Sequence, residues 1–203
     1  MTIALAARNP DKLAGLKRAV GATAFACDAS VPGEVNRLFE DVAEAMGDPD
    51  VVVYNASARV RGPIAALEPS DVARALAVGA FGGFLVAREA ARRMVPKEHG
   101  AILLTGASAS VKGFAESAPF AMAKFALRGL AQSLARELHP KGIHVAHFVI
   151  DGGIASPGRP SPSDKPDSML DPDAIADSYL HLLGQDRSAW TWEVELRPWV
   201  ERF

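Results

Sequence analysis

The stretch Phe120-Ala-Met-Ala-Lys124 decides the fold of this chain, because it opens a helix-then-strand unit. Apolar residues recur with helical spacing from Phe120 to His139, which predicts a long amphipathic helix. A nearly continuous apolar run follows at Ile143–Ile150, as expected for a strand covered on both faces. A long helix followed by such a strand is typical of α/β proteins with a parallel sheet.

The same alternation extends over most of the chain. Short apolar runs predict strands at Ile3–Ala7, Ala22–Cys27, Val51–Asn55, Ala101–Thr105 and Val145–Ile150. Longer periodic runs predict helices at Pro10–Val20, Val31–Met46, Asp71–Val95 and Ser117–His139. The pattern predicts an α/β fold with a doubly wound parallel sheet, in a single domain over residues 1–203 with its core in residues 3–155.

The last quarter of the chain has a different character. Residues 156–170 are rich in proline and serine and predict a long loop that would shape a substrate pocket. Residues 171–203 predict a helix to about Leu183 and then an edge strand at Trp190–Trp199, which Pro198 would stop or hold at the edge.

Composition narrows the function classes. The chain is 49% hydrophobic and 23% charged, with a net charge of −2, which is ordinary for a globular protein and argues against nucleic acid as a partner. The apolar runs are interrupted too often to predict a membrane span, and the N-terminus does not resemble a signal peptide. Cys27 is the only cysteine, so no internal disulfide forms and a cytoplasmic location is expected.

The histidines predict no metal site, because they are dispersed. His144 and His147 are expected to be buried and neutral, on opposite faces of their strand. Glu193 and Glu195 are expected on the solvent side of the edge strand.

Several segments together resemble a known family. The landmarks, in chain order, are Val51–Ser57 like a strand ending in Asn-Asn-Ala-Gly, the long helix Asp71–Val95, the strand and serine segment Ala101–Ser110, Phe120–Lys124 like a Tyr-x-x-x-Lys helix, and Asp151–Ile154 like a Pro-Gly-x-Ile turn. Their order and spacing resemble the short-chain dehydrogenase/reductase family. This resemblance implies a Rossmann-like fold and hydride transfer between a nicotinamide and a carbonyl or alcohol substrate.

The resemblance also shows which family residues are replaced. The proton-donating tyrosine is Phe120, the substrate-binding serine is Ala107, and the relay asparagine is Gly79, whereas the lysine is kept as Lys124. A positioned acid or base contributes about 10²–10⁴-fold to a rate. The three replacements therefore predict that most ordinary carbonyl reduction is lost.

Two kinds of residue could compensate. Tyr54 follows a predicted central strand and is a candidate substitute acid; the alternative is a core aromatic side chain. Ser108 and Ser110 flank Ala107, but if the strand continued, Ser108 would point to the opposite face from Ala107.

The family's glycine-rich loop is not found in this sequence. In the family, a first strand and a Thr-Gly-x-x-x-Gly-x-Gly loop cradle the cofactor pyrophosphate. Met1 stands where the family's second strand begins, so about thirty residues of one strand–loop–helix unit have no counterpart. Either the first two strands slide across to close the gap, or the chain is a piece of a longer protein or the product of an internal start codon.

The remaining nucleotide positions resemble an NADP site. By resemblance the cofactor-binding residues are Arg8, Asn9, Asp28, Ala29, Asn55, Ala56, Ser57, Lys124, Gly152 and Ile154. Arg8 suits the 2′-phosphate of NADP, while Asp151 replaces a proline and would place a negative charge near the carboxamide. Because the pyrophosphate cradle is not in the sequence, NADP binding is predicted to be weak or lost.

The family resemblance also implies a partner. Gly79, Gly82 and Gly83 in one helix suggest close approach of another backbone. In this family two such helices form a dimer interface, so a homodimer through residues 71–95 and 117–139 is expected. The favoured hypothesis is a degenerate oxidoreductase homologue; the alternatives are an active NADP(H)-dependent enzyme with a rearranged proton donor, and an inactive fragment of a longer enzyme.

Overall fold

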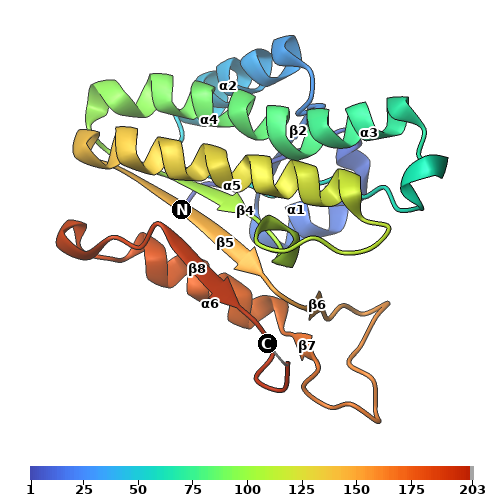
Figure 1. Cartoon of the computed structure of the whole chain (residues 1–203). Helices are drawn as coiled ribbons and strands as arrows, with labels where there is room; N and C mark the ends of the chain where they lie inside the picture. Colours follow the sequence, from blue (N-terminus) through green and yellow to red (C-terminus); the bar gives the residue numbers. More distant parts are fainter. Residues whose placement is uncertain (202–203) are drawn as a thin grey trace.

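A four-stranded parallel sheet forms the centre of the molecule, in a computed structural model that describes residues 1–201 (Figure 1). Its order is β3 (Val51–Tyr54), β4 (Gly100–Thr105), β5 (Ile143–Ile150) and β8 (Glu193–Leu196). All eight residues of β5 are buried, as its apolar run predicts. The edge strand predicted near the C-terminus is confirmed as β8, which ends before Pro198.

Strand register aligns the ends of this sheet. Val51 of β3 pairs with Ala101 of β4, and Gly100 of β4 pairs with Ile143 of β5. The carboxyl ends of these strands therefore lie along one edge, where ligands bind in open parallel sheets.

The first two strands form a separate sheet. β1 (Ala4–Ala7) pairs in parallel only with β2 (Thr23–Ala26), and no ladder joins β1 to β3 within residues 1–201. Of the alternatives that the sequence leaves open, the one in which these strands slide across to close the gap is therefore not observed. The reason lies in the connection that follows them, because α2 (Pro32–Met46) packs on α4 (Gly82–Met94) and so fixes where β2 ends.

One face of the central sheet is covered by a helical layer. Figure 1 shows α3 (Pro69–Leu76), α4 and α5 (Ala118–Leu138) crossing it, with α2 beyond α4. The predicted helix Asp71–Val95 consists of α3, a π-helical turn at Ala77–Phe81, and α4. This layer and the sheet share a large apolar cluster that includes Phe39, Ile102 and Leu127.

This helical run is also long and apolar enough to cross a membrane. The run is Pro69–Lys97, 29 residues, and 39% of its most apolar window is buried inside the molecule. It packs against α2 and α5, as a core helix of a globular protein does. Length and composition alone are weak support for a membrane span.

The opposite face of the sheet is covered by α6 (Pro172–Leu183), as Figure 1 shows. A second apolar cluster lies there and contains Leu103, Phe148 and Leu182. The predicted 156–170 loop is pinned at its base by a short parallel pair, β6 (Gly153–Ile154) with β7 (Met169–Leu170).

Short helical turns complete the chain. The predicted helix Pro10–Val20 begins as a 3₁₀ turn and continues as α1 (Ala14–Val20). The 3₁₀ turns lie at Pro10–Leu13, Ile64–Ala66, Val95–Lys97, Ser108–Ser110, His139–Lys141 and Arg187–Ala189.

Candidate active site

Lys124 lies at the carboxyl edge of the sheet, in the second turn of α5. Its Nζ donates a hydrogen bond to the carbonyl oxygen of Thr105, the last residue of β4, at 2.7 Å. The side chain is buried, and this burial lowers the pKa of Lys124 to about 8. The lysine that the sequence singles out is therefore fixed to the end of a central strand.

Phe120 occupies the position where the resembled family has its tyrosine. Its ring centroid lies 5.1 Å from the guanidinium carbon of Arg59 and 5.9 Å from Nζ of Lys124. A phenyl ring attracts cations through its π face but has no proton to transfer. The side chain at this position therefore contacts two cations and cannot donate a proton.

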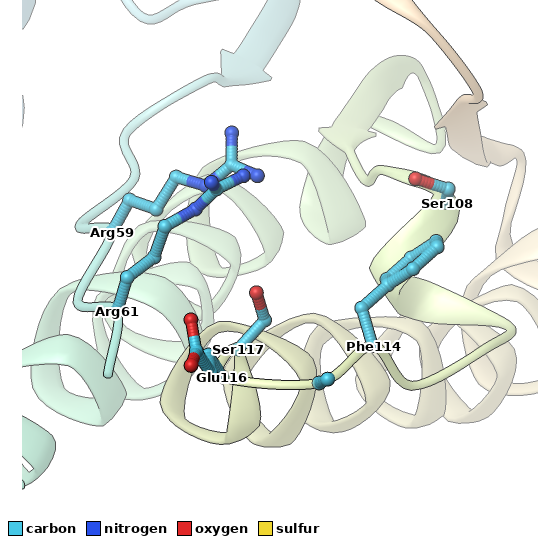
Figure 2. Close-up of a pocket in the computed structure, with 7 residues that line it drawn as sticks. Arg59, Arg61, Ser108, Phe114, Glu116 and Ser117 are labelled. Atoms are coloured by element: carbon cyan, nitrogen blue, oxygen red, sulfur yellow. The ribbon is translucent and has the colours of Figure 1, made fainter. Parts of the chain in front are cut away.

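The serine segment lies beyond the strand. β4 ends at Thr105, as predicted, and Ser108–Ser110 forms a 3₁₀ turn, so the strand alternation that would set Ser108 opposite Ala107 does not apply. Ser108 lines a cavity, and its hydroxyl points into the open space (Figure 2). Ser110 is buried, and its Oγ accepts a hydrogen bond from the backbone N–H of Ala107 at 3.1 Å. Of the two serines, Ser108 presents a hydroxyl to the cavity.

Gly79 leaves no room for the relay asparagine of the resembled family. It is buried in the π-helical turn, and a Cβ atom added there would lie 2.6 Å from the Cβ of Ala123 in α5. Such a contact is far inside van der Waals distance, so α5 would have to move. The glycine therefore serves close helix packing.

Tyr54 is held in the core rather than in the cavity. Its hydroxyl donates to the carbonyl oxygen of Val78, and its ring lies against Gly83. The side chain is buried, which raises the pKa of Tyr54 well above its ordinary value. This placement favours the core-aromatic interpretation over the substitute acid.

The residues predicted to bind the adenosine end lie on the separate two-stranded sheet and after β3. Arg8, Asn9, Asn55 and Ser57 are exposed, and Ala29 and Ala56 are half-buried. Asn9 is occupied as a cap, because its Oδ1 accepts from the N–H of Asp11 at 3.0 Å.

Asp28 also has a local structural role. Its Oδ1 accepts from the backbone N–H of Ser30 at 2.9 Å and from its hydroxyl at 2.6 Å. These bonds lower the pKa of Asp28, and the charge of Arg8 adds to the effect. The carboxylate therefore shapes the turn before α2.

Asp151 carries a negative charge that the protein itself neutralises. It is buried, and its Oδ2 lies 3.1 Å from Nζ of Lys112 and 3.2 Å from Nη2 of Arg197. Two cations therefore compensate the negative charge that Asp151 adds at this edge of the sheet. Beside it, a Cβ added at Gly152 would lie 2.9 Å from Pro198, whereas Ile154 is exposed.

A partly buried ion-pair network that the sequence does not reveal lies behind this edge. Nδ1 of His147 lies 3.0 Å from Oε2 of Glu193, and Arg128 binds both carboxylate oxygens of Glu193 at 2.6 and 2.7 Å. Burial lowers the pKa of His147 to about 4 although Glu193 opposes the shift. Because a carboxylate only accepts hydrogen bonds, Nδ1 of the neutral ring donates to Glu193.

The two histidines behave as the sequence predicts, since burial also lowers the pKa of His144. Glu193 does not lie on the solvent side as predicted, because its side chain is only 17% exposed and pairs with Arg128 of α5. Strand alternation predicts on which face of the sheet Glu193 lies. It does not predict that Arg128 of α5 covers the glutamate on that face.

The cavity at this edge measures about 270 Å³ and is shown in Figure 2. It is lined by Arg59, Arg61, Ser108, Phe114, Ala115, Glu116 and Ser117. Only Ser108 among these was singled out in the sequence. The others lie in connecting segments, and the Arg-Val-Arg run at 59–61 is the one signal that could have pointed to them.

Comparison with known proteins gives matches over nearly the whole chain. The family model described as enoyl-(acyl carrier protein) reductase matches residues 1–191. Short chain aldehyde dehydrogenase 1 of Euphorbia lathyris is 32% identical over 133 residues, 64% of this chain and 46% of that protein. The 3-oxoacyl-[acyl-carrier-protein] reductase MabA of Mycobacterium avium is 31% identical over 128 residues, 63% of this chain and 50% of that protein. The chain thus spans about half the length of these curated relatives.

Solved structures agree in fold. A short-chain dehydrogenase from Rhodopseudomonas palustris has a TM-score of 0.83 and 36% identity, covering 98% of this chain and 87% of that chain. A metagenomic short-chain oxidoreductase in complex with NADP has a TM-score of 0.84 and 27% identity, covering 97% of this chain and 86% of that chain.

Proposed function

Because the chain belongs to the short-chain dehydrogenase/reductase family, we propose that it is a degenerate oxidoreductase homologue, with weak NADP(H) binding and little or no hydride transfer. The observation that carries the proposal is Phe120, which stands at the proton-donor position between the cations Arg59 and Lys124. Without a hydroxyl there, the alkoxide that hydride transfer creates on a carbonyl substrate has no positioned acid.

Both tyrosines of the chain are engaged elsewhere. Tyr54 is bonded to Val78. Tyr179 lies 2.8 Å from Oγ1 of Thr105 and stacks on Phe148. Ser108 reaches the cavity, but an aliphatic hydroxyl can only orient a carbonyl oxygen by a hydrogen bond and is far too weak an acid to protonate it.

The nucleotide end supports the proposal of weak binding. The adenosine positions Arg8 and Asn55 are exposed and fit a nucleotide, and the NADP complex of the metagenomic relative favours NADP over NAD. The pyrophosphate end does not fit, because the sequence holds no glycine-rich loop and β1 is not paired to β3 within residues 1–201.

Two measurements test this proposal together. Isothermal titration with NADPH is expected to show no low-micromolar binding, and NADPH oxidation with a panel of ketones and aldehydes is expected to stay at the background rate. The double variant Ala107→Ser/Phe120→Tyr, which restores two family residues, is expected to stay inactive because the cradle is still not there. Steady turnover by the unmodified chain that Lys124→Ala abolishes would refute the proposal.

We also propose a homodimer through α3–α4 and α5. Phe81, Phe84, Met122 and Phe125 on these helices are each 44% to 50% exposed, which leaves an apolar surface next to a groove between α4 and α5. Sedimentation velocity is expected to give a dimer mass for the unmodified chain and a monomer for Phe84→Glu/Phe125→Glu. A monomer at all concentrations would contradict it.

A further inference from the structure

The cavity in Figure 2 is built from two connecting segments that meet over the start of α5. Arg59 and Arg61 reach in from the segment after β3, while Ser108 and Phe114 stand on the opposite side and Glu116 and Ser117 lie at the base (Figure 2). The backbone N–H of Gly62 donates to the carbonyl oxygen of Glu116 at 3.1 Å. This bond ties the two segments together and fixes the spacing of the walls.

Arg59 and Arg61, which form one wall of the cavity, carry positive charge that the protein does not compensate. Arg59 and Arg61 form no ion pair with any residue of the described chain, 1–201. By contrast, Arg93 pairs with Glu89 and Arg128 pairs with Glu193. An arginine without a carboxylate partner, beside a second one, retains its donors for a ligand.

Arg59 lies close enough to other arginines to be repelled by their charges. Burial, and then the charges of Arg61 and Arg159, lower the pKa of Arg59. A guanidinium stays charged at any physiological pH, so the repulsion is relieved by an anion rather than by loss of a proton. The contact of Arg59 with the ring of Phe120 holds the guanidinium at the cavity mouth.

The other side chains that line the cavity indicate the charge and the size of the anion that would fit there. The lining holds two arginines and one carboxylate, Glu116, so its net charge is +2 − 1 = +1. The hydroxyls of Ser108 and Ser117 add donors, and the Ser117 hydroxyl is not used to cap α5. Phe114 supplies an apolar wall, and a volume of about 270 Å³ limits the ligand to a small molecule.

We propose that this cavity binds a small organic carboxylate, with its carboxylate group between Arg59 and Arg61 and its apolar part against Phe114. The planar guanidinium fork matches a carboxylate, and a single negative charge matches the net charge of the lining. Inorganic phosphate is disfavoured because it has no apolar part to contact Phe114. The inference rests on the proposed function only in taking this edge as the ligand side of the scaffold, and binding requires neither nucleotide nor turnover.

Titration with benzoate, without nucleotide, tests the site, and benzamide is its matched neutral probe. We expect benzoate to bind with a millimolar or lower Kd and benzamide to bind at least about tenfold more weakly, because a charge-assisted bond is lost. Arg59→Gln and Arg61→Gln should each weaken benzoate binding by about tenfold or more, whereas Arg74→Gln on the exposed side of α3 should leave it unchanged. Circular dichroism of each variant checks its folding.

A second variant keeps the test sharp if an arginine variant fails to fold. Glu116→Gln removes the one carboxylate of the lining and should tighten benzoate binding several-fold. Tighter binding of inorganic phosphate than of benzoate, equal binding of benzoate and benzamide, no benzoate binding at 10 mM (about ten times the expected Kd), or no effect of either arginine variant would each overturn the inference. NADPH turnover in a parallel assay would refute the proposed function while leaving the carboxylate site standing.

Discussion

The two sheets of this molecule contain strands of similar apolar character in very different surroundings. None of the residues that the structure describes in β1, α1 and β2 is buried, whereas every residue of β5 is. The difference comes from neighbours, because β5 has a strand on each side and helices on both faces, while β1 has only β2 beside it. A strand's apolar sequence becomes stabilising only when the fold supplies the surface that covers it.

This difference separates the two halves of the expected active site. The carboxyl edge of the four-stranded sheet holds Lys124, Phe120 and the arginine cavity in fixed contacts. The adenosine positions Arg8 and Asp28 depend on the exposed two-stranded sheet. We therefore expect the ligand edge to be rigid and the nucleotide end to be poorly organised.

The largest effect is expected on the free energy of unfolding, when one leucine from each sheet is replaced by alanine. Leu103→Ala in β4 should lower the free energy of unfolding by about 2–5 kcal/mol, because Leu103 is fully buried and its removal leaves a cavity. Leu5→Ala in β1 should lower it by less than about 1 kcal/mol, since Leu5 is only half-buried. Urea unfolding measures both; equal losses would break the comparison.

The pH dependence of stability should also come from the central sheet, because His147 is buried there. The pKa of His147 is lowered from 6.5 to about 4 by burial and by the charges of Arg128 and Lys124, while Glu193 opposes the shift. The unfolded chain therefore binds this proton first, and stability is lost as the pH falls from about 6.5 to 4, by about 3 kcal/mol at pH 4. His144, whose pKa is lowered as well, adds loss in the same direction.

Urea midpoints measured between pH 7 and pH 4 check this expectation. His147→Gln should flatten the pH profile over that range, whereas His181→Gln, which changes an exposed histidine on α6, should leave its slope as it is. A profile that is equally steep in His147→Gln would contradict the assignment.

A smaller effect is expected where α5 meets the π-helical turn. Gly79→Ala should destabilise the protein by about 1–3 kcal/mol, because the new Cβ would lie 2.6 Å from that of Ala123. Differential scanning calorimetry should show a lower Tm. An unchanged Tm would show that the helices separate easily and that an asparagine could be accepted at this position.

The smallest effect on stability is expected at two glycines that have open space around them. Gly129→Ala in α5 should stabilise the protein by about 0.5–1 kcal/mol, because alanine favours a helix and nothing lies within 4 Å of its new Cβ. Gly15→Ala in α1 should raise the Tm less, because α1 opens before the central sheet unfolds. Equal gains in Tm would mean that both regions unfold as one unit.

The sequence predicts the elements of the fold well because most of them are buried by their neighbours along the chain. The predicted strand at 145–150 is observed at Ile143–Ile150, and the predicted helix at 117–139 at Ala118–Leu138. Failures occur where distant segments meet. Whether β1 would reach β3 depends on how α2 packs, and the pairing of Glu193 with Arg128 depends on which helix covers an edge strand.

The candidate site follows the same rule: positions within one local motif could be predicted from the sequence, and contacts between distant segments could not. Phe120 and Lys124 lie together near the start of α5, on the helix that the sequence predicts. The direction of Ser108 could not be predicted from strand alternation, because the chain leaves the strand two residues before Ala107. Arg59 and Arg61 lie in an irregular segment whose position is set by a contact with Glu116, and no periodic pattern reports such a contact.

Hydrogen exchange of the backbone amides, with and without NADPH, tests most directly whether the nucleotide end is poorly organised and the ligand edge rigid. We predict that amides of β1 and β2 exchange at least about 100-fold faster than those of β5, because they open locally while β5 exchanges only through global unfolding. NADPH should not change this ratio. Protection of β1 and β2 equal to that of β5, or strong protection of them by NADPH, would contradict the account.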